Sequence, residues 1–226
     1  MNTGDGSAAL LLLADGRFPA GGYAHSGGLE PTINAHRVRE VESLERFLEG
    51  RARTTGAVAA AFAAAACGAL RDDDRTRFAA LDPELDARMP SPTQRATSRQ
   101  LGRQLLRVIS TIRPGPMLGR LEGSPHQSIV LGAAAASFGL GRRDTAVLAL
   151  HEAVAGPAAA AVRLLSLDPF STHAALARLG PLLDTLAAAA TAASHAEPDE
   201  LPAAAAPLLD LAAEDHVTRD MRLFAS

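Results

Sequence analysis

A serine, a histidine and two glycines stand together near the N-terminus in an order that resembles the nucleophile turn of a serine hydrolase. The segment reads Ala24-His25-Ser26-Gly27-Gly28, with Ala24 in place of the first glycine of the G-x-S-x-G pattern. Such a serine needs a strand before it and a helix after it, and its general base is placed by the fold. Residues 18–22 contain a proline and two glycines and make a poor strand. The pattern therefore favours a polar loop, and a small serine hydrolase using Ser26 stays as the alternative.

The same loop has a second chemical possibility, which is contact with a partner or an anion. Two glycine pairs, Gly21-Gly22 and Gly27-Gly28, enclose the only tyrosine of the chain, Tyr23, together with His25 and Ser26. Glycine-rich backbone before a helix presents N–H groups that can bind an anion, although a tight turn would explain the glycines equally well. The polar side chains favour a contact surface.

Histidines and cysteine give no metal-site pattern. The seven histidines are His25, His36, His126, His151, His173, His195 and His216. No two of them are three or four residues apart, so no pair shares one face of a helix as metal ligands would. The single cysteine, Cys67, excludes an intramolecular disulfide and a multi-cysteine zinc site. We therefore expect no bound metal or cofactor.

Sequence patterns typical of helices predict the elements that carry these residues. Residues 41–70 show apolar residues at helical spacing, and Ser91-Pro92-Thr93-Gln94 is a capping box that opens a helix toward Ile112. Further helix starts are predicted at Ser124-Pro125, at Asp144 and at Asp168-Pro169, and a last helix over 201–216. Gly156-Pro157 is expected to kink or split the helix that contains it.

A row of arginines follows one of these helices. Arg95, Arg99, Arg103 and Arg107 recur every four residues, beside apolar residues such as Leu101. This spacing predicts a solvated basic face, with an acidic partner surface as the functional alternative. The three aspartates at 72–74 predict a turn or a helix start.

The whole pattern predicts an all-α fold. No run of β-branched alternation is present, and the breaks at 113–116, 139–141 and 197–198 are too short for interdomain linkers. We expect residues 1–226 to form a single compact domain of roughly eight to eleven helices, ending in a docking tail at 217–226. Alanine-rich helix faces also suit a homodimer.

Charge and hydropathy exclude several classes of protein. The formal net charge is −3, which argues against nucleic acid as a main partner. All 22 basic residues are arginines, so a lysine-dependent phosphate loop and a lysine Schiff base are excluded. The apolar run Ala57 to Leu70 is shorter than the roughly 20 residues of a membrane helix. A soluble cytoplasmic protein without membrane contact is expected.

Five collinear segments resemble the family of urease accessory proteins called UreF. They span nearly the whole chain, and five such segments in the same order identify the family more specifically than any single segment does. The first is a leucine run and a proline-glycine loop that end in Ser26-Gly27-Gly28-Leu29-Glu30. The others are Ser98 to Leu106, the helix-opening His126, Val162 to Leu167, and the ending from His216 to Ser226.

This resemblance implies a function without catalysis. UreF-like proteins are all-α, homodimeric and cytoplasmic, and they bridge the accessory protein UreD (also called UreH) and the GTPase UreG. The resulting complex delivers nickel to apo-urease, so nickel would act in the pathway rather than as a cofactor of this chain. The resemblance therefore predicts a urease maturation scaffold; an unrelated helical regulatory protein is the remaining alternative.

The resemblance also assigns candidate contact residues in two groups. The tail positions are candidates for the UreD side, and they are His216, Arg222, Leu223, Phe224 and Ser226. The loop positions are candidates for the GTPase side or for the dimer surface, and they are Tyr23, His25, Ser26, Glu30 and, farther along the chain, Arg163. In this interpretation Phe224 supplies apolar area and Arg222 a directional charged contact.

Overall fold

The computed structural model describes residues 5–115, 118–121, 123–217 and 223–224. All regular structure in these ranges is helical, which confirms the predicted all-α class. The ten α-helices are α1 (Asp5–Ala14), α2 (Leu29–Asn34), α3 (Val41–Arg51), α4 (Ala57–Arg71), α5 (Arg75–Ala87), α6 (Pro92–Ile112), α7 (Gln127–Ser137), α8 (Arg142–Leu165), α9 (Pro169–Ala193) and α10 (Pro207–Val217). Short turns of helix are η1 (Gly22–Ala24), η2 (Ala52–Gly56), η3 (Leu118–Arg120) and η4 (Pro198–Glu200).

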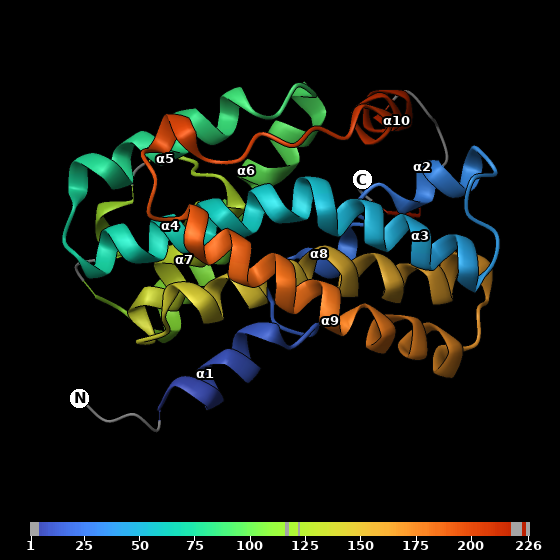
Figure 1. The fold of residues 1–226 in the computed structure, drawn as a ribbon, viewed down its shortest axis with the longest axis horizontal. Helices are drawn as coiled ribbons and strands as arrows, with labels where there is room; N and C mark the ends of the chain where they lie inside the picture. The colour runs from blue at the N-terminus through green and yellow to red at the C-terminus, as the bar shows by residue number, and fades with distance from the viewer. Residues whose placement is uncertain (1–4, 116–117, 122, 218–222, 225–226) are drawn as a thin grey trace.

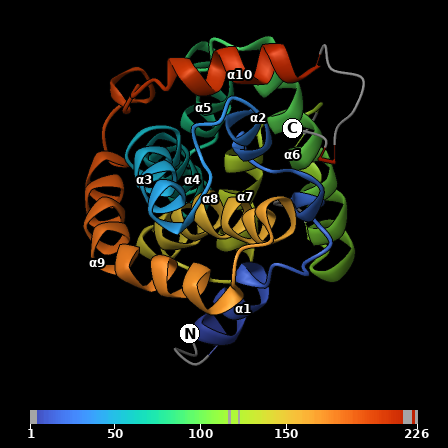
Figure 2. The same ribbon diagram turned by 90° about the vertical axis from the view of Figure 1, so that its right-hand side faces the viewer.

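Helix α4 is the centre of the fold, and α7, α8 and α9 pack around it (Figures 1 and 2). Its residues 60–67 are completely buried and almost all alanine. A β-carbon on Gly132 would lie 2.4 Å from the carbonyl oxygen of Ala63, so α7 approaches α4 as closely as its backbone permits. The small side chains therefore allow the backbones of α4 and α7 to pack in close contact, without large side chains between them.

Two helical stretches are long and apolar enough to cross a membrane by length and composition. They are Val41–Arg71 and Arg142–Leu165, and 67% and 56% of their apolar windows are buried inside the fold. Both belong to the group of helices that packs around α4. Their apolar character is therefore accounted for by the protein core.

Several predicted helix starts are confirmed. The Ser91 hydroxyl accepts the N–H of Gln94, the Asp168 carboxylate accepts that of Ser171, and the Asp74 carboxylate accepts that of Arg77. The start at Ser124 is wrong, and Asp144 does cap its helix but from the third position of α8 rather than from the residue before it. Helix α7 begins later, at Gln127, because Pro125 packs against Gly102 of α6; Asp144 binds back to the N–H of Gly141 from inside α8.

Two further helix predictions need correction. The last helix begins at Pro207 rather than at residue 201, since 201–206 run extended past α5 and Arg88 donates to the carbonyl oxygens of Leu201 and Pro202. The basic face is also wrong in part. Arg99 binds Asp82 and Asp86 of α5 at 3.0 and 2.6 Å instead of facing solvent.

Pro157 does not split its helix, because a neighbouring side chain replaces the hydrogen bond that it removes. Proline has no N–H, so the carbonyl of Ala153, four residues earlier in α8, lacks a helical donor. Arg51 Nε donates to this oxygen at 2.9 Å, and Arg51 Nη1 donates to the carbonyl of Gly27 at 2.8 Å. The buried guanidinium therefore joins α3, α8 and the glycine loop.

The Arg51 contacts can be tested by replacing the side chain with an apolar one of similar length. Arg51→Met removes this donor from the half-buried carbonyl oxygens of Ala153 and Gly27, so we expect the free energy of unfolding to fall by about 1–3 kcal/mol. Arg53→Met is the control, because Arg53 is exposed and pairs only with Glu49; it should change the value by less than about 1 kcal/mol. Urea unfolding of both variants measures the difference, and equal losses would contradict the assignment.

Candidate functional site

The glycine loop, residues 21–28, leads directly into α2 and shapes its first turn. Gly21, Gly27 and Gly28 have φ angles of 85°, 60° and 87°, which side-chain-bearing residues rarely adopt. Ser26 lies completely buried, and its hydroxyl oxygen accepts the N–H of Glu30 at 3.2 Å. Ser26 therefore supports the first turn of α2 instead of facing solvent. No strand precedes it in the described residues, so the structure gives no support to the hydrolase interpretation at Ser26.

Glu30 holds the end of the chain against this loop. One carboxylate oxygen of Glu30 accepts the N–H of Leu223 at 2.8 Å, and the other accepts that of Phe224 at 2.9 Å. His216 Nε2 lies 3.6 Å from the same carboxylate and 3.4 Å from the carbonyl oxygen of Phe224. We call this group of Glu30, His216, Leu223 and Phe224 the Glu30 clasp. It joins residues nearly two hundred positions apart.

The aromatic ring at the end of the chain is covered by the chain itself. Phe224 is 6% exposed and belongs to a buried cluster with Leu29 and Leu48. The guanidinium of Arg163 lies 4.4 Å from the centre of the Phe224 ring, and it also donates to the carbonyl oxygen of Tyr23 at 3.2 Å. The apolar area of Phe224 is therefore not available to a partner in this conformation, and Arg163 ties the loop to the tail.

The two predicted groups of contact residues meet in one place. Loop residues Tyr23 and Glu30 and tail residue Phe224 are all joined through the clasp and Arg163. Arg222 and Ser226 lie outside the described residues. The exposed apolar side chains around this place come from the loop, from α10 and from the chain end, and they are Tyr23, Leu208, Leu211, Val217 and Leu223.

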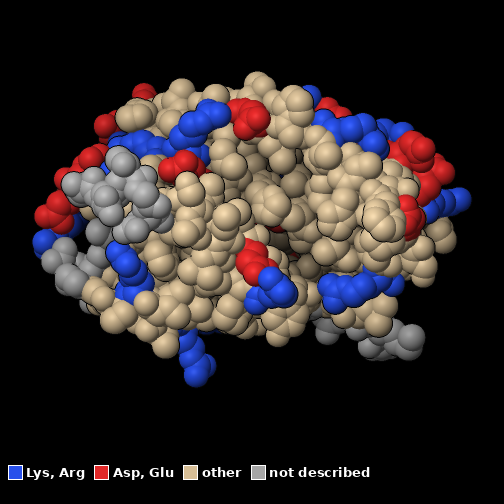
Figure 3. All heavy atoms as spheres, turned by 90° about the horizontal axis from the view of Figure 1, so that it is seen from below, with Lys and Arg blue, Asp and Glu red and all other residues tan. Residues whose placement is uncertain are grey.

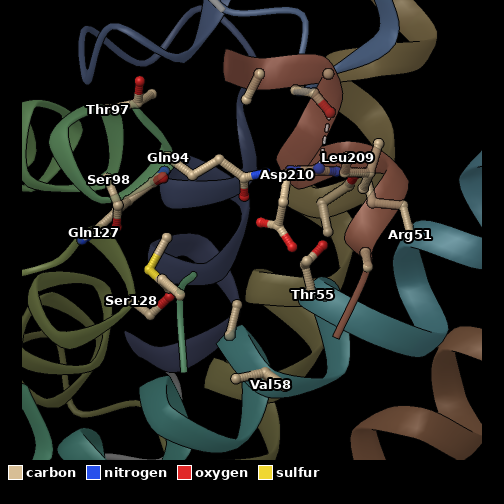
Figure 4. Close-up of a pocket in the computed structure, with 18 of the residues that line it drawn as sticks. Arg51, Thr55, Val58, Gln94, Thr97, Ser98, Gln127, Ser128, Leu209 and Asp210 are labelled. Atoms are coloured by element: carbon tan, nitrogen blue, oxygen red, sulfur yellow. Dashed lines mark hydrogen bonds between the residues drawn. The ribbon is translucent and has the colours of Figure 1, made fainter. Parts of the chain in front are cut away.

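A cavity of about 230 Å³ lies beside the clasp, between the loop, η2, α6 and α10 (Figure 4). His25 and His216 stand in its wall, and burial lowers the pKa of His25. In Figure 4 the side chains of Gln94, Asp210 and Thr55 point toward one another from three different elements. Among the described residues the buried hydroxyl of Thr55 has no hydrogen-bond partner, so the cavity keeps an unused polar group.

Glu152 is the most perturbed acid in the cavity wall. Burial raises the pKa of its carboxyl to about 7, and Gln127 Nε2 lies 3.3 Å from one of its oxygens. Burial and the neighbouring Glu214 also raise the pKa of Asp210. The cavity therefore contains two carboxyl groups that hold protons more tightly than exposed ones do.

Sequence reasoning did not find Arg51, Thr55, Glu152 or Asp210. The signal for Arg51 is Pro157, which leaves a carbonyl that some donor must satisfy, but the donor is distant in sequence. The other three become notable only through helix packing. In the described part of the chain no three His, Cys, Asp or Glu residues gather as metal ligands.

Comparison with known proteins gives a consistent family match. The profile of the UreF family matches residues 38–180. A urease accessory protein UreF from Mycobacterium sp. (strain JLS) is 42% identical over 218 residues, which cover 96% of this chain and 97% of that protein. The UreF proteins of Mycolicibacterium vanbaalenii and Mycobacterium tuberculosis (strain H37Rv) are 39% and 38% identical over 220 residues, covering 97% of this chain and 98% of each relative.

The Glu30 clasp can be weakened with little change of shape. Glu30→Gln replaces one carboxylate oxygen with an NH₂ group that faces a backbone N–H, so we expect the clasp to lose about 1–3 kcal/mol. Hydrogen exchange at the amides of Leu223 and Phe224 should become at least about fivefold faster, while exchange in α4 stays constant. Glu42→Gln, at an exposed carboxylate in α3, is the control. Unchanged protection of the two amides would contradict the clasp.

Glu152 makes a pH-dependent contribution to stability. Its folded-state pKa of about 7 lies above its ordinary value of 4.5, so the folded protein keeps a proton that the unfolded chain releases. This stabilisation is complete below pH 4.5 and is lost as the pH rises through 7. We therefore expect Glu152→Gln to be more stable than the wild type by about 1–3 kcal/mol at pH 8, with no such advantage at pH 4.5. Urea unfolding at both pH values measures this, and a pH-independent difference would contradict it.

Proposed function

Since this chain belongs to the UreF family of urease accessory proteins, we propose that it acts as a scaffold in urease maturation, where it bridges UreD (UreH) and the GTPase UreG. The complex so formed delivers nickel to apo-urease. Nickel is then the cargo of the complex, and the scaffold role needs no catalysis by this chain. The cytoplasm, where apo-urease is assembled, is the expected location.

The Glu30 clasp is the observation that carries this proposal. The resemblance makes the tail a candidate for the UreD side and the loop a candidate for the GTPase side or the dimer surface, and the clasp joins tail and loop by hydrogen bonds. A partner that moves Leu223 and Phe224 would also change the surroundings of Glu30 and of the loop. Two partners bound at these places would therefore affect each other through a continuous set of contacts.

The UreD contact is proposed at the exposed side chains of the tail and of α10. Leu223 is 80% exposed, and Leu208 and Leu211 of α10 are 60% and 68% exposed. Apolar side chains in such exposed positions contribute to a partner interface by their burial on binding. Arg222 and Ser226 remain proposed members of this contact. His216 and Phe224 contribute by holding Leu223 in place.

The UreG contact is proposed at the loop, with Tyr23 as its centre. The Tyr23 side chain is 66% exposed, and a tyrosine offers a large contact area together with a hydroxyl group. Arg163 holds the backbone of Tyr23 in position. His25, Ser26 and Glu30 are buried, so their proposed contribution is to shape the loop.

A homodimer of this chain is part of the proposal. Figure 3 shows a face that is mostly uncharged, with an acidic and a basic side chain beside a hollow near its middle and more charged side chains toward its edges. Helix α1 lies on this side of the fold, and its Leu11 and Leu12 are 73% and 45% exposed. A face of this kind suits association of two copies of the chain.

Co-expression with UreD and UreG, followed by size-exclusion chromatography with light scattering, tests the scaffold. We expect a complex built on a dimer of this chain. Leu223→Asp should weaken UreD binding at least about tenfold, and Tyr23→Asp should weaken UreG binding by a similar factor, since each places a charge in a proposed apolar contact. Ile112→Asp, at the far end of α6 and 48% exposed, is the control.

The outcomes separate the scaffold from its contact surfaces. Wild-type protein that binds neither UreD nor UreG would overturn the scaffold proposal. Normal binding by both folded variants would leave the scaffold in place and show that the contact residues are wrong. Circular dichroism of each variant establishes that it is folded.

A further inference from the structure

A half-buried serine, a buried histidine and a partly exposed aspartate stand in hydrogen-bonding order where α5 and α6 meet the start of α7. The Oγ of Ser98 lies 3.0 Å from Nδ1 of His126, and Nε2 of His126 lies 3.0 Å from Oδ1 of Asp86. The side chain of His126 is completely buried. These three residues come from three helices, and none of them belongs to the Glu30 clasp or to the hydrolase-like loop pattern.

Chemistry decides which nitrogen of His126 carries the proton. The carboxylate of Asp86 can only accept a hydrogen bond, because Arg99 and His126 hold its pKa below the ordinary value although burial opposes this. Nε2 of His126 is therefore protonated. Burial lowers the pKa of His126, so its ring is neutral and Nδ1 accepts the hydroxyl proton of Ser98. This arrangement is the one that a general base needs in order to activate a serine.

The cluster is held rigidly by its neighbours. Arg99 binds both Asp82 and Asp86, and Asp82 accepts the backbone N–H of His126 at 2.8 Å. The aspartate and the histidine are thus each fixed by a second contact. Such fixed geometry reduces the reorganisation that a proton transfer would require.

Ser98 has access to space, unlike His126. Its side chain lies in the wall of the 230 Å³ cavity, and Figure 4 shows it beside Gln127 and Ser128 at the start of α7. The N–H of Gln127 lies 3.3 Å from Ser98 Oγ. The first-turn N–H groups of a helix favour negative charge. In α7 the N–H of Gln127 is used by Ser98 and that of Ile129 by the carbonyl oxygen of His126 at 3.0 Å, so the N–H of Ser128 is the one assigned to an anion. The first turn of α7 is therefore next to the position where an oxyanion would form.

We propose that Ser98, His126 and Asp86 form an esterase site that accepts a small uncharged carboxylic ester in the cavity. Ser98 Oγ attacks the ester carbonyl carbon and passes its proton to His126 Nδ1, while Asp86 stabilises the imidazolium. The N–H of Ser128, in the first turn of α7, stabilises the oxyanion. The C–O bond to the alcohol breaks, and the alcohol leaves with the proton from His126. Water then attacks the acyl-serine, His126 takes its proton and returns it to Ser98, and the acid departs.

The cavity sets the class of substrate. Leu101 and Leu131 line it together with the polar side chains shown in Figure 4, so it offers one apolar wall and one polar wall. Its volume of about 230 Å³ suits a short acyl chain on a small alcohol. This activity goes beyond the scaffold role and does not depend on UreD or UreG.

A short-chain alkyl fluorophosphonate, which bonds to activated serines with loss of fluoride, tests the site on the wild-type protein. We expect one adduct, which peptide mass spectrometry places at Ser98. Hydrolysis of p-nitrophenyl acetate should fall at least about tenfold in Ser98→Ala. Ser110→Ala is the matched control, since Ser110 lies in the same helix α6 but outside the cavity wall; it should react within about twofold of the wild type.

The mapping on the wild-type protein stays decisive even if Ser98→Ala fails to fold. An adduct at Ser98 that is absent from folded Ser98→Ala and present in Ser110→Ala supports the proposal. Folded wild-type protein that shows no adduct at Ser98 under excess probe would overturn it. Equal ester hydrolysis by wild type and Ser98→Ala would also overturn it, and the cluster would then be a tie between three helices.

Discussion

A single buried guanidinium, that of Arg51, is the contact on which the arrangement of the loop and the core helices depends. A proline in the middle of a core helix leaves a carbonyl without its helical donor. Arg51 satisfies that carbonyl of Ala153 and extends to the carbonyl of Gly27. A β-carbon at Gly27 would come within 3.0 Å of Pro157, so the loop must lie close against this part of α8. Desolvation lowers the pKa of Arg51 to about 10, which leaves it charged at neutral pH.

In the Glu30 clasp, too, one charged side chain satisfies two backbone groups, here near the C-terminal end of the chain. Two consecutive backbone N–H groups cannot be buried without acceptors, and Glu30 offers one oxygen to each. Because Glu30 is in the first turn of α2, its position follows from the loop, and the loop follows from Arg51. The order of dependence therefore runs from Pro157 through Arg51 and Gly27 to Glu30, and from there to the position of Leu223 and Phe224.

Local chemistry could be predicted from the sequence, and contacts between distant residues could not. The caps at Ser91 and Asp168 were predictable because each depends on residues within three positions. The start of α7 was not, since it depends on how Pro125 meets Gly102 of another helix. Glu30, His216 and Phe224 were named as contact residues on resemblance, yet nothing in their spacing indicated that they touch one another. Arg51 illustrates the limit best, because its partner sites are 24 and 102 residues away.

The alanine-rich core has a consequence for where polar groups can lie. Close approach of α4 and α7 leaves no room between them for long side chains, and the polar contacts of α7 lie instead at its start, where His126 meets side chains of α5 and α6. The hydrogen bonds and ion pairs at this place allow four polar residues to be half or fully buried. They are Asp82, Asp86, Arg99 and His126. A network whose members are all paired can be buried at small net cost, whereas loss of one member leaves an unpaired charge behind. The same full pairing that lets this network hold three helices together also fixes the tautomer of His126, so stability and any proton transfer at Ser98 rest on one set of hydrogen bonds.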